Sequence, residues 1–465
     1  TVHAMASVRA VEDALKLQIL PNAQYIRNLI LINHALHDHI VHFYQLSALD
    51  WVDIMTIPSA DPAKAASLAQ SLSNWTGNSS KEMQVAQDKI KNFAASGQLG
   101  MFASGYWGHP AMHLPPDVNL IAFNHYLQAL EYPRKALQVV GILGGKTPHI
   151  QNLAVGGVQN AINLDSMATI NMDRLYMIKY LQDGVIPFVQ ECYFNDACTL
   201  ATLYPDWMTC GKGVNNYMAV PDLPGGLILN GNIGAASTFY AAADGEFREA
   251  VAEDLTHAWY NGKEPQRPWQ GETIPDYTDF QENGKYTWVT APRYDQKPMQ
   301  VGPLSQILVG YAQGHPLTKK WTDLALDKVS TIGKRRVSVT DLQSTMGRHV
   351  ARAIRCAMLS ELATKHWEYL VTSVSRGDTA TYNPPKFPDG ELQGVGTHEA
   401  PRGTLSHWVV VKNGRIANYQ AVVPTTWNAS LRDQKGIPGP YEASLIGNPV
   451  ADPEKPLEVL RIVHS

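Results

Sequence analysis

Residues 399–428 read EAPRGTLSHWVVVKNGRIANYQAVVPTTWN, and this stretch organises the interpretation of the whole chain. Two runs rich in β-branched and aromatic residues, His407 to Lys412 and Arg415 to Val423, flank the dipeptide Asn413-Gly414. This dipeptide supplies the positive φ angles that a two-residue hairpin turn requires. The sequence therefore predicts a tight β-hairpin here.

Polar side chains stand at both open ends of this hairpin. Arg402 precedes the first run, and Pro424-Thr425 follows the second. A hairpin brings its open ends together, so we expect the Arg402 guanidinium and the Thr425 hydroxyl to lie near one another and to face a ligand. The alternative for Arg402 is a salt bridge to Glu399 that only braces the loop.

The composition limits the class of protein. Of 465 residues, 45% are hydrophobic and only 17% are charged, a charged fraction below the usual quarter. This balance favours a large buried interior or a broad surface covered by a partner subunit. A net charge of -4 gives no reason to expect nucleic acid as a partner. No apolar run reaches the length that spans a bilayer.

Hydrophobic periodicity predicts a mainly α protein with smaller β elements, an α+β fold built on a long buried helical bundle. We expect one large body, residues 1–465, with three parts: a helical core over about 1–200 and 304–375, an irregular β and loop insertion over about 215–301, and the hairpin with the C-terminal segment over about 395–465. Residues 377–394 read as a loop. Helices are expected over 3–17, 21–46, 61–70, 81–96, 119–143, 172–191, 304–312, 320–326, 341–373 and 457–465.

The expected helix 21–46 is apolar around nearly its whole circumference, which is typical of a buried helix. It nevertheless places His34, Asp38 and His42 on one face, at intervals of four residues. Such a face is a possible divalent-metal site, although hydrogen bonds that hold packed helices in register are the favoured interpretation for the histidines. A buried carboxylate such as Asp38 needs a cation, and Arg402 is the candidate.

The four cysteines are Cys192, Cys198, Cys210 and Cys356. They form no Cys-x-x-Cys pair and match no zinc spacing, so we expect buried free thiols.

Eight motifs along the chain together resemble one family, the large subunit of nickel–iron hydrogenases, and within it the membrane-associated, periplasm-facing uptake group. The motifs are TVHAMASVRA (1–10), HDHIVHFYQ (37–45), ALDWVD (48–53), SGQLG (96–100), GGKTPH (144–149), EAPRG (399–403), VVPTTWN (422–428) and PLEVLR (456–461).

The chain departs from this family in one respect. The family holds its nickel and iron with four cysteines in two Cys-x-x-Cys motifs, one near each end. The given sequence begins after the place of the first motif and stops before the second, and its own cysteines do not replace them. We interpret it as an internal segment of a complete subunit, with the nickel–iron cysteine ligands outside the given sequence.

The resemblance implies roles for several residues. Arg402 corresponds to the arginine above the open bridging position between nickel and iron, with Asp38 as its carboxylate partner and Pro401 beside it. In the family the iron carries carbon monoxide and two cyanides. Arg402 and Thr425 would hydrogen-bond those cyanides, and Pro424 lies beside Thr425 in the same motif.

Three further residues of the chain correspond to functional positions of the family, apart from the residues around Arg402. His3 matches a histidine about one helical turn beyond a metal-ligating cysteine, near its sulfur. The backbone carbonyl of Ala421 matches a ligand of a magnesium-type site. His149 matches a histidine on the side of the small subunit.

The implied function is reversible heterolytic cleavage of H2 to protons and electrons, with a cysteine thiolate or the arginine as proton acceptor. Electrons would leave through iron–sulfur clusters of a separate small subunit, in a heterodimer or a dimer of heterodimers. From there they would reach a membrane acceptor such as a cytochrome b. The complex would lie on the periplasmic side of the membrane, exported with the small subunit.

Two other functions remain as alternatives. The first is a non-catalytic structural or quinone-binding relative without the metal cysteines, which would leave Asp38, Arg402 and the VVPTTWN motif without a purpose. The second is a metallohydrolase that uses the histidine-rich helix, although His37 and His39 point to different faces of that helix.

Overall fold

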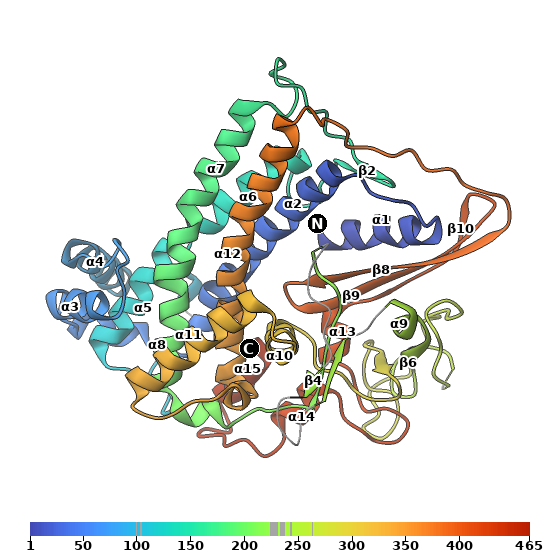
Figure 1. Cartoon of the computed structure of the whole chain (residues 1–465). Coiled ribbons are helices and arrows are strands. Elements are labelled where there is room, and N and C mark those ends of the chain that lie inside the picture. Colours follow the sequence, from blue (N-terminus) through green and yellow to red (C-terminus); the bar gives the residue numbers. More distant parts are fainter. Residues whose placement is uncertain (99, 103–104, 224–230, 233–237, 242–243, 263) are drawn as a thin grey trace.

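The computed structural model describes residues 1–465 except 99, 103–104, 224–230, 233–237, 242–243 and 263. A bundle of long helices occupies one half of the molecule, and a three-stranded sheet covered by one helix occupies the other (Figure 1). Both chain ends lie between these two halves. The predicted mainly helical fold with smaller β elements is confirmed.

Four helices form the bundle: α2 (Pro21–Val41), α6 (Tyr132–Gly144), α7 (Met172–Pro187) and α12 (Thr345–Ser375). Helices α2 and α7 each pack against both α6 and α12. The remaining helices are α1 (Val2–Ala14), α3 (Pro62–Leu72), α4 (Ser80–Ser96), α5 (Pro116–Gln128), α8 (Phe194–Leu203), α9 (Asp244–Ala250), α10 (Pro303–Ala312), α11 (Pro316–Gly333), α13 (Pro424–Asn428), α14 (Pro440–Leu445) and α15 (Leu457–His464).

Helix α2 is buried as predicted, and it contains one buried cation. Arg27 donates to both carboxylate oxygens of Glu12, at 2.9 and 2.6 Å. It also donates to the carbonyls of Ala154 and Gly157, at 3.0 and 2.8 Å. A buried charge is tolerated when it is paired and hydrogen-bonded in this way. Arg27 therefore links α1, α2 and the hairpin of β1 (Leu153–Ala154) and β2 (Gly157–Val158).

The predicted single helix 119–143 is wrong. The structure has α5, which ends at Gln128, and α6, which begins at Tyr132. The break has a local cause, because Pro133 has no N–H to donate and its ring clashes with the carbonyl of residue 129 in a continuous helix. Proline is tolerated in the first turn of α6, where no partner for the N–H is needed.

Two bundle helices end in π-helical turns that the sequence did not reveal. Helix α2 continues as a π-helical turn over His42–Ser47, and α7 continues likewise over Phe188–Tyr193 before α8 begins. The two turns pack together, with the Tyr44 and Phe188 ring centroids 5.7 Å apart. Such turns frequently occur near functional sites.

The predicted hairpin is confirmed, but it belongs to a larger sheet. Strands β9 (Gly403–Lys412) and β10 (Arg415–Val422) are joined by Asn413-Gly414, with φ angles of 51° and 73°. Strand β8 (Glu391–Ala400) pairs antiparallel with β9, which gives the order β10-β9-β8. The expected loop 377–394 is therefore wrong from residue 391 onward. Arg402 lies in the turn between β8 and β9.

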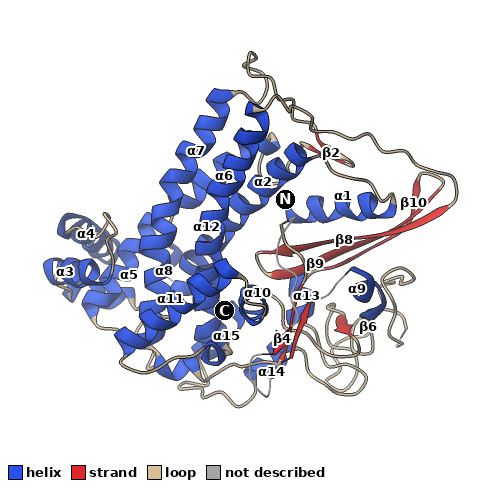
Figure 2. Ribbon diagram, in the orientation of Figure 1, coloured by secondary structure: helices blue, strands red, loops and turns tan. Residues whose placement is uncertain are grey.

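Helix α1 lies directly against this sheet (Figure 2). Two glycines of β8 permit the close approach. A Cβ atom on Gly396 would lie 2.0 Å from the carbonyl oxygen of Ala6, and one on Gly394 would lie 2.0 Å from that of Ala10. Both distances are far below van der Waals contact. The absence of side chains at these positions therefore sets the distance between helix and strand.

Three smaller sheets complete the fold. They are β1 (Leu153–Ala154) with β2 (Gly157–Val158), β3 (Asn216–Ala219) with β5 (Thr238–Ala241) and β4 (Gly231–Asn232), and β6 (Val251–Asp254) with β7 (Ala291–Tyr294). The predicted insertion 215–301 thus contains short strands and α9, but residues 224–230, 233–237, 242–243 and 263 of it lie outside the described part. The division of the chain into three parts stays a prediction. Over the described residues, every helix is too short or too polar to cross a membrane.

Candidate active site

The ion pair between Arg402 and Asp38 is the central contact of the candidate site. Nη1 of Arg402 lies 3.2 Å from Oδ1 and 3.0 Å from Oδ2 of Asp38, which α2 carries. The Arg402 side chain is 48% exposed and that of Asp38 is 16% exposed. The pairing inferred from the sequence is therefore confirmed. The two residues are 364 positions apart in the chain.

The alternative partner, Glu399, is engaged elsewhere. Its carboxylate accepts hydrogen bonds from the Thr404 hydroxyl at 2.6 Å, the Gln306 amide at 2.6 Å and the Val220 backbone N–H at 2.8 Å. Burial raises the pKa of Glu399 to about 7, although these three bonds and the nearby Arg355 act in the opposite direction. Glu399 thus holds the strand ends together without pairing with Arg402.

A cavity of about 180 Å³ lies beside the Arg402 guanidinium, and Thr425 lines it as well. The structure thus brings both residues of the predicted pair to the wall of one cavity. Further lining comes from Arg348 and Arg352 of α12 and from the chain end at His464 and Ser465. The cavity thus lies where the sheet, the bundle and the C-terminal helix meet.

The cavity wall carries an excess of positive charge. Arg352 donates to the carbonyls of Pro401 and Ser465, both at 3.2 Å, and its Nε has no hydrogen-bond partner among the described residues. Arg348 donates to the Ser465 hydroxyl and the Gly211 carbonyl, at 2.7 and 2.6 Å. In the described structure neither arginine forms an ion pair with an Asp or Glu side chain. The cavity therefore suits an anionic occupant.

The histidines of α2 do not form a metal site with Asp38 in the described structure. Burial is the main cause that lowers the pKa of His34, to about 4, and it also lowers the pKa of His39 and of His42. Nε2 of His42 bonds to the carbonyl of His464 at 2.7 Å. His42 thus ties helices together, as the favoured interpretation held.

The other predicted site residues lie around the sheet. Nδ1 of His3 lies 2.9 Å from Nε2 of His407 on β9, and Ala421 of β10 pairs with His407 across the ladder. Pro401 and Pro424 are buried, and Pro424 begins α13. His3, Ala421 and the two prolines do not line the cavity. His149 is exposed on a loop, with a φ angle of 61°.

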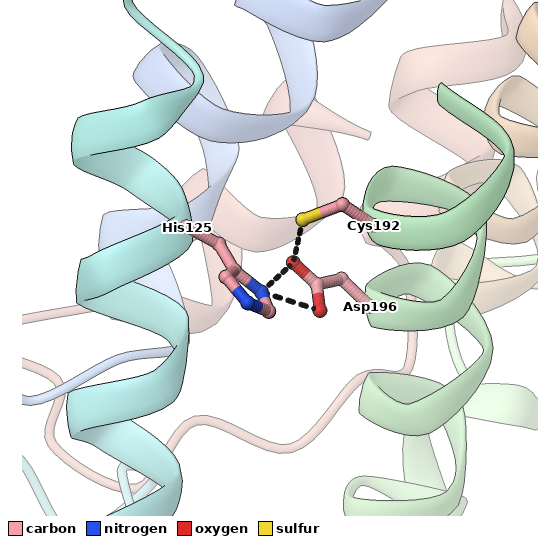
Figure 3. Close-up of side chains that lie close together, drawn as sticks. All are labelled: His125, Cys192 and Asp196. Carbon is pink, nitrogen blue, oxygen red and sulfur yellow. Dashed lines mark hydrogen bonds and ion pairs between the residues drawn. The ribbon is translucent and has the colours of Figure 1, made fainter. Parts of the chain in front are cut away.

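A cluster that the sequence did not indicate joins α5 to α8 and to the π-helical turn before it (Figure 3). Nδ1 of His125 lies 2.8 Å from Oδ2 of Asp196, and the Tyr44 hydroxyl donates to that same oxygen at 2.6 Å. The other ring nitrogen, Nε2, faces the Asn78 side-chain oxygen at 2.7 Å. Burial raises the pKa of Cys192, whose sulfur lies 4.0 Å from Asp196. These polar atoms are hydrogen-bonded to one another, so the cluster connects the helices structurally.

The cysteines agree largely with the prediction. All four are free, and Cys192, Cys198 and Cys356 are buried, whereas Cys210 is partly exposed. None of the four lines the cavity.

Comparison with known proteins shows which family shares this sequence and fold. The family model described as nickel-dependent hydrogenase matches residues 1–465. The Hydrogenase-2 large chain of Escherichia coli K12 is 48% identical, over 100% of this chain and 84% of that protein. The uptake hydrogenase large subunit of Bradyrhizobium diazoefficiens is 40% identical, over 100% of this chain and 82% of that protein. The reduced Ni-Fe-Se hydrogenase of Desulfovibrio vulgaris Hildenborough superposes with a TM-score of 0.77 at 25% identity, over 100% of this chain and 84% of that one.

Fold, site and these relatives together define the catalytic subunit of an oxidoreductase, in which a cationic cavity lies between a helical bundle and a β-sheet. The chain belongs to the nickel-dependent hydrogenase family, as the large subunit. Its activity is that of a hydrogenase, which acts on H2 at a nickel–iron centre. The relatives above are all named as hydrogenases, which favours this function over a non-catalytic subunit.

Proposed function

We propose that Arg402, Asp38 and Pro401 are the catalytic residues that this chain supplies over the nickel–iron centre. Thr425, Pro424 and His3 would lie around it, although of these three only Thr425 lines the cavity, and the cysteine ligands would be ones that the given sequence does not contain. The observation that supports this proposal is the Arg402–Asp38 ion pair at a cavity that Thr425 also lines.

The donor set around the cavity fits an iron that carries carbon monoxide and two cyanides. Cyanide is anionic and accepts hydrogen bonds. The Arg402 guanidinium, the Thr425 hydroxyl and the unpartnered Nε of Arg352 are donors at or beside the cavity. These groups would hold the diatomic ligands, and the nickel–iron centre would supply the heterolytic cleavage of H2.

Arg402 would polarise H2 rather than remove its proton. A guanidinium gives up its proton only at very high pH, whereas a fixed positive charge stabilises charge that develops during the reaction. Asp38 holds the guanidinium in place and offsets its charge. We infer that the proton acceptor is a cysteine thiolate. The backbone carbonyl of Ala421 would bind a magnesium-type ion.

The partner of this chain would be an iron–sulfur small subunit, since the related chains are named as large subunits. An apolar surface groove is the supporting feature. His37, the neighbour of Asp38, lines it together with Leu130, Thr147 and Met177. Leu130 is 54% exposed and Met177 is 51% exposed. Electrons must leave close to the metal centre, and His37 connects this groove to the helix that carries Asp38.

We further propose a periplasmic, membrane-associated complex that passes its electrons to a membrane subunit such as a cytochrome b. The support is the name of the uptake hydrogenase relatives.

The test of the catalytic proposal is Arg402→Lys in the purified holoenzyme. We expect H2 oxidation to fall by about two orders of magnitude, which is typical for the loss of one preorganised electrostatic group. Infrared bands of metal-bound carbon monoxide and cyanide should remain, because the metal ligands are unchanged. The matched control is Arg415→Lys, at an exposed position of β10. Unchanged H2 oxidation in Arg402→Lys would show that this arginine only braces its turn.

A further inference from the structure

Three side chains with metal-binding atoms converge between α5 and α8 (Figure 3). Cys192 lies in the π-helical turn before α8, Asp196 lies on α8 four residues later, and His125 lies on α5. The sulfur, a carboxylate oxygen and the ring nitrogen Nδ1 all lie within 4.8 Å of one another. Thiolate sulfur, carboxylate oxygen and imidazole nitrogen are the donor types that bind Zn²⁺ in proteins.

The spacing of these atoms suits a tetrahedral ion. Ligand atoms that lie about 2.0–2.3 Å from a zinc ion lie about 3.3–3.8 Å from one another. Nδ1 of His125 is 2.8 Å from Oδ2 of Asp196, and that oxygen is 4.0 Å from Sγ of Cys192. These separations fall on either side of the tetrahedral values. Small side-chain rotations would therefore bring all three atoms to bonding distance from one ion.

Neighbouring groups would hold these ligands in place. When Nδ1 of His125 binds a metal, the ring proton must be on Nε2. The side-chain oxygen of Asn78 lies 2.7 Å from that nitrogen and can accept its hydrogen bond. The Tyr44 hydroxyl donates to Oδ2 of Asp196 at 2.6 Å and lies 3.6 Å from Sγ of Cys192. Partners of this kind orient metal ligands and strengthen metal binding.

A cavity gives an ion access to this cluster. Its volume is about 190 Å³, and its lining includes Tyr44, Asn78, His125 and Asp196. The Asp196 side chain is 20% exposed, whereas that of His125 is 4% exposed. A water molecule from the cavity would take the fourth position of a tetrahedral ion, as in zinc sites with three protein ligands.

We propose that His125, Cys192 and Asp196 form a binding site for Zn²⁺. On binding, the Cys192 thiol loses its proton to water and its sulfur bonds to the ion, while the metal replaces the hydrogen bonds among the three side chains. No electron is transferred, because Zn²⁺ has no redox chemistry in proteins. The ion would fasten α5 to α8 and so stabilise the folded subunit. This inference does not depend on the proposed roles of Arg402 and Asp38.

Anomalous X-ray scattering from holoenzyme crystals grown with Zn²⁺ tests the site directly. Data collected just above and just below the zinc absorption edge distinguish zinc from nickel and iron. We expect a zinc peak in contact with Nδ1 of His125, Sγ of Cys192 and a carboxylate oxygen of Asp196. Zinc at surface sites alone, or no bound zinc, would overturn the proposal.

Cys192→Ala is an independent test in solution, since it removes the sulfur and keeps both partners of the His125–Asp196 hydrogen bond. After equilibration with Zn²⁺ and removal of free ions, elemental analysis should find one zinc fewer per holoenzyme than in the unchanged protein. Cys198→Ala is the matched control, because Cys198 is a buried free thiol of α8 outside the cluster. It should keep the full zinc content.

Two further measurements on these variants complete the test. Zn²⁺ should raise the unfolding temperature of the Cys198→Ala holoenzyme but not that of the Cys192→Ala holoenzyme. H2 oxidation should be unchanged in both variants, because neither cysteine lines the cavity beside Arg402. Equal zinc contents in Cys192→Ala and the unchanged protein would show that the ion binds elsewhere and would overturn the proposal.

Discussion

At the residue scale, Glu399 is a buried carboxyl that keeps its proton up to a higher pH than a free glutamate does. Its folded pKa of about 7 lies above the ordinary value of 4.5, with burial as the main cause. The Gln306 side-chain amide donates from its nitrogen to this carboxyl, and its oxygen, Oε1, has no hydrogen-bond partner among the described residues. A rotation of this amide would let its oxygen accept a hydrogen bond from the protonated Glu399 carboxyl. The folded protein therefore binds this proton more tightly than the unfolded chain does.

The sign of the pH effect follows from that shift. Between about pH 4.5 and 7 the folded state holds a proton that the unfolded chain has lost, so this group's contribution to stability falls as the pH rises through that interval. We expect Glu399→Gln to keep the shape of the site and to remove that decline. The measurement is the thermal unfolding temperature of the holoenzyme from pH 4.5 to 7. The same decline in wild type and variant would contradict the raised pKa.

At the element scale, the contact between α1 and β8 determines where the functional residues of both elements lie. His3 and Arg9 on α1 reach across to the sheet, and Arg9 donates to the Thr397 carbonyl at 2.9 Å. These contacts require the close approach that Gly394 and Gly396 allow. A displacement of α1 would move His3 away from His407.

We therefore expect Gly396→Ala to destabilise the protein by about 1–3 kcal/mol, since its Cβ would meet backbone that cannot yield without displacing the helix. The unfolding temperature of the purified subunit complex measures this loss. Gly333→Ala on α11 serves as the control, because its added Cβ would meet nothing nearer than 3.5 Å. Equal stability of the two variants would show that α1 adjusts without penalty.

At the scale of the whole molecule, the site depends on three distant parts of the chain. Arg352 in the bundle holds the Pro401 carbonyl beside the catalytic turn and the Ser465 carbonyl at the chain end. The groove near His37 opens on the outside of the same bundle. The bundle thus separates a cationic cavity from an apolar surface that is close to Asp38.

If the small subunit covers that groove, a charge placed in it should prevent assembly. We expect Met177→Glu to abolish co-purification of the small subunit, because an unpaired buried charge is very costly. Ile446→Glu, at an exposed apolar residue outside the groove, should not affect assembly. Co-purification of the small subunit with Met177→Glu in wild-type amount would place the interface elsewhere.

Local sequence determined the parts of the structure whose cause is local. The β9–β10 turn follows from Asn413-Gly414, because few residues adopt two successive positive φ angles. The burial of α2 follows from its apolar circumference, and Asp38 on this helix led to Arg402 because a carboxylate removed from water needs a cation. Asp38 proves to be partly exposed, at 16%. The chemistry of the nickel–iron centre came from the resemblance of the sequence motifs to the family. Hydrophobic periodicity carries no information about it.

Only the tertiary structure decided the rest. Strand β8 contains Gly394, Gly396 and several polar residues, so its extended form depends on pairing with β9 and packing on α1. The two π-helical turns and the His125–Asp196 contact occur where separate helices meet. The positive cavity and the contact between His3 and His407 likewise combine groups hundreds of positions apart. Distances between such groups are set by packing, which sequence spacing does not encode.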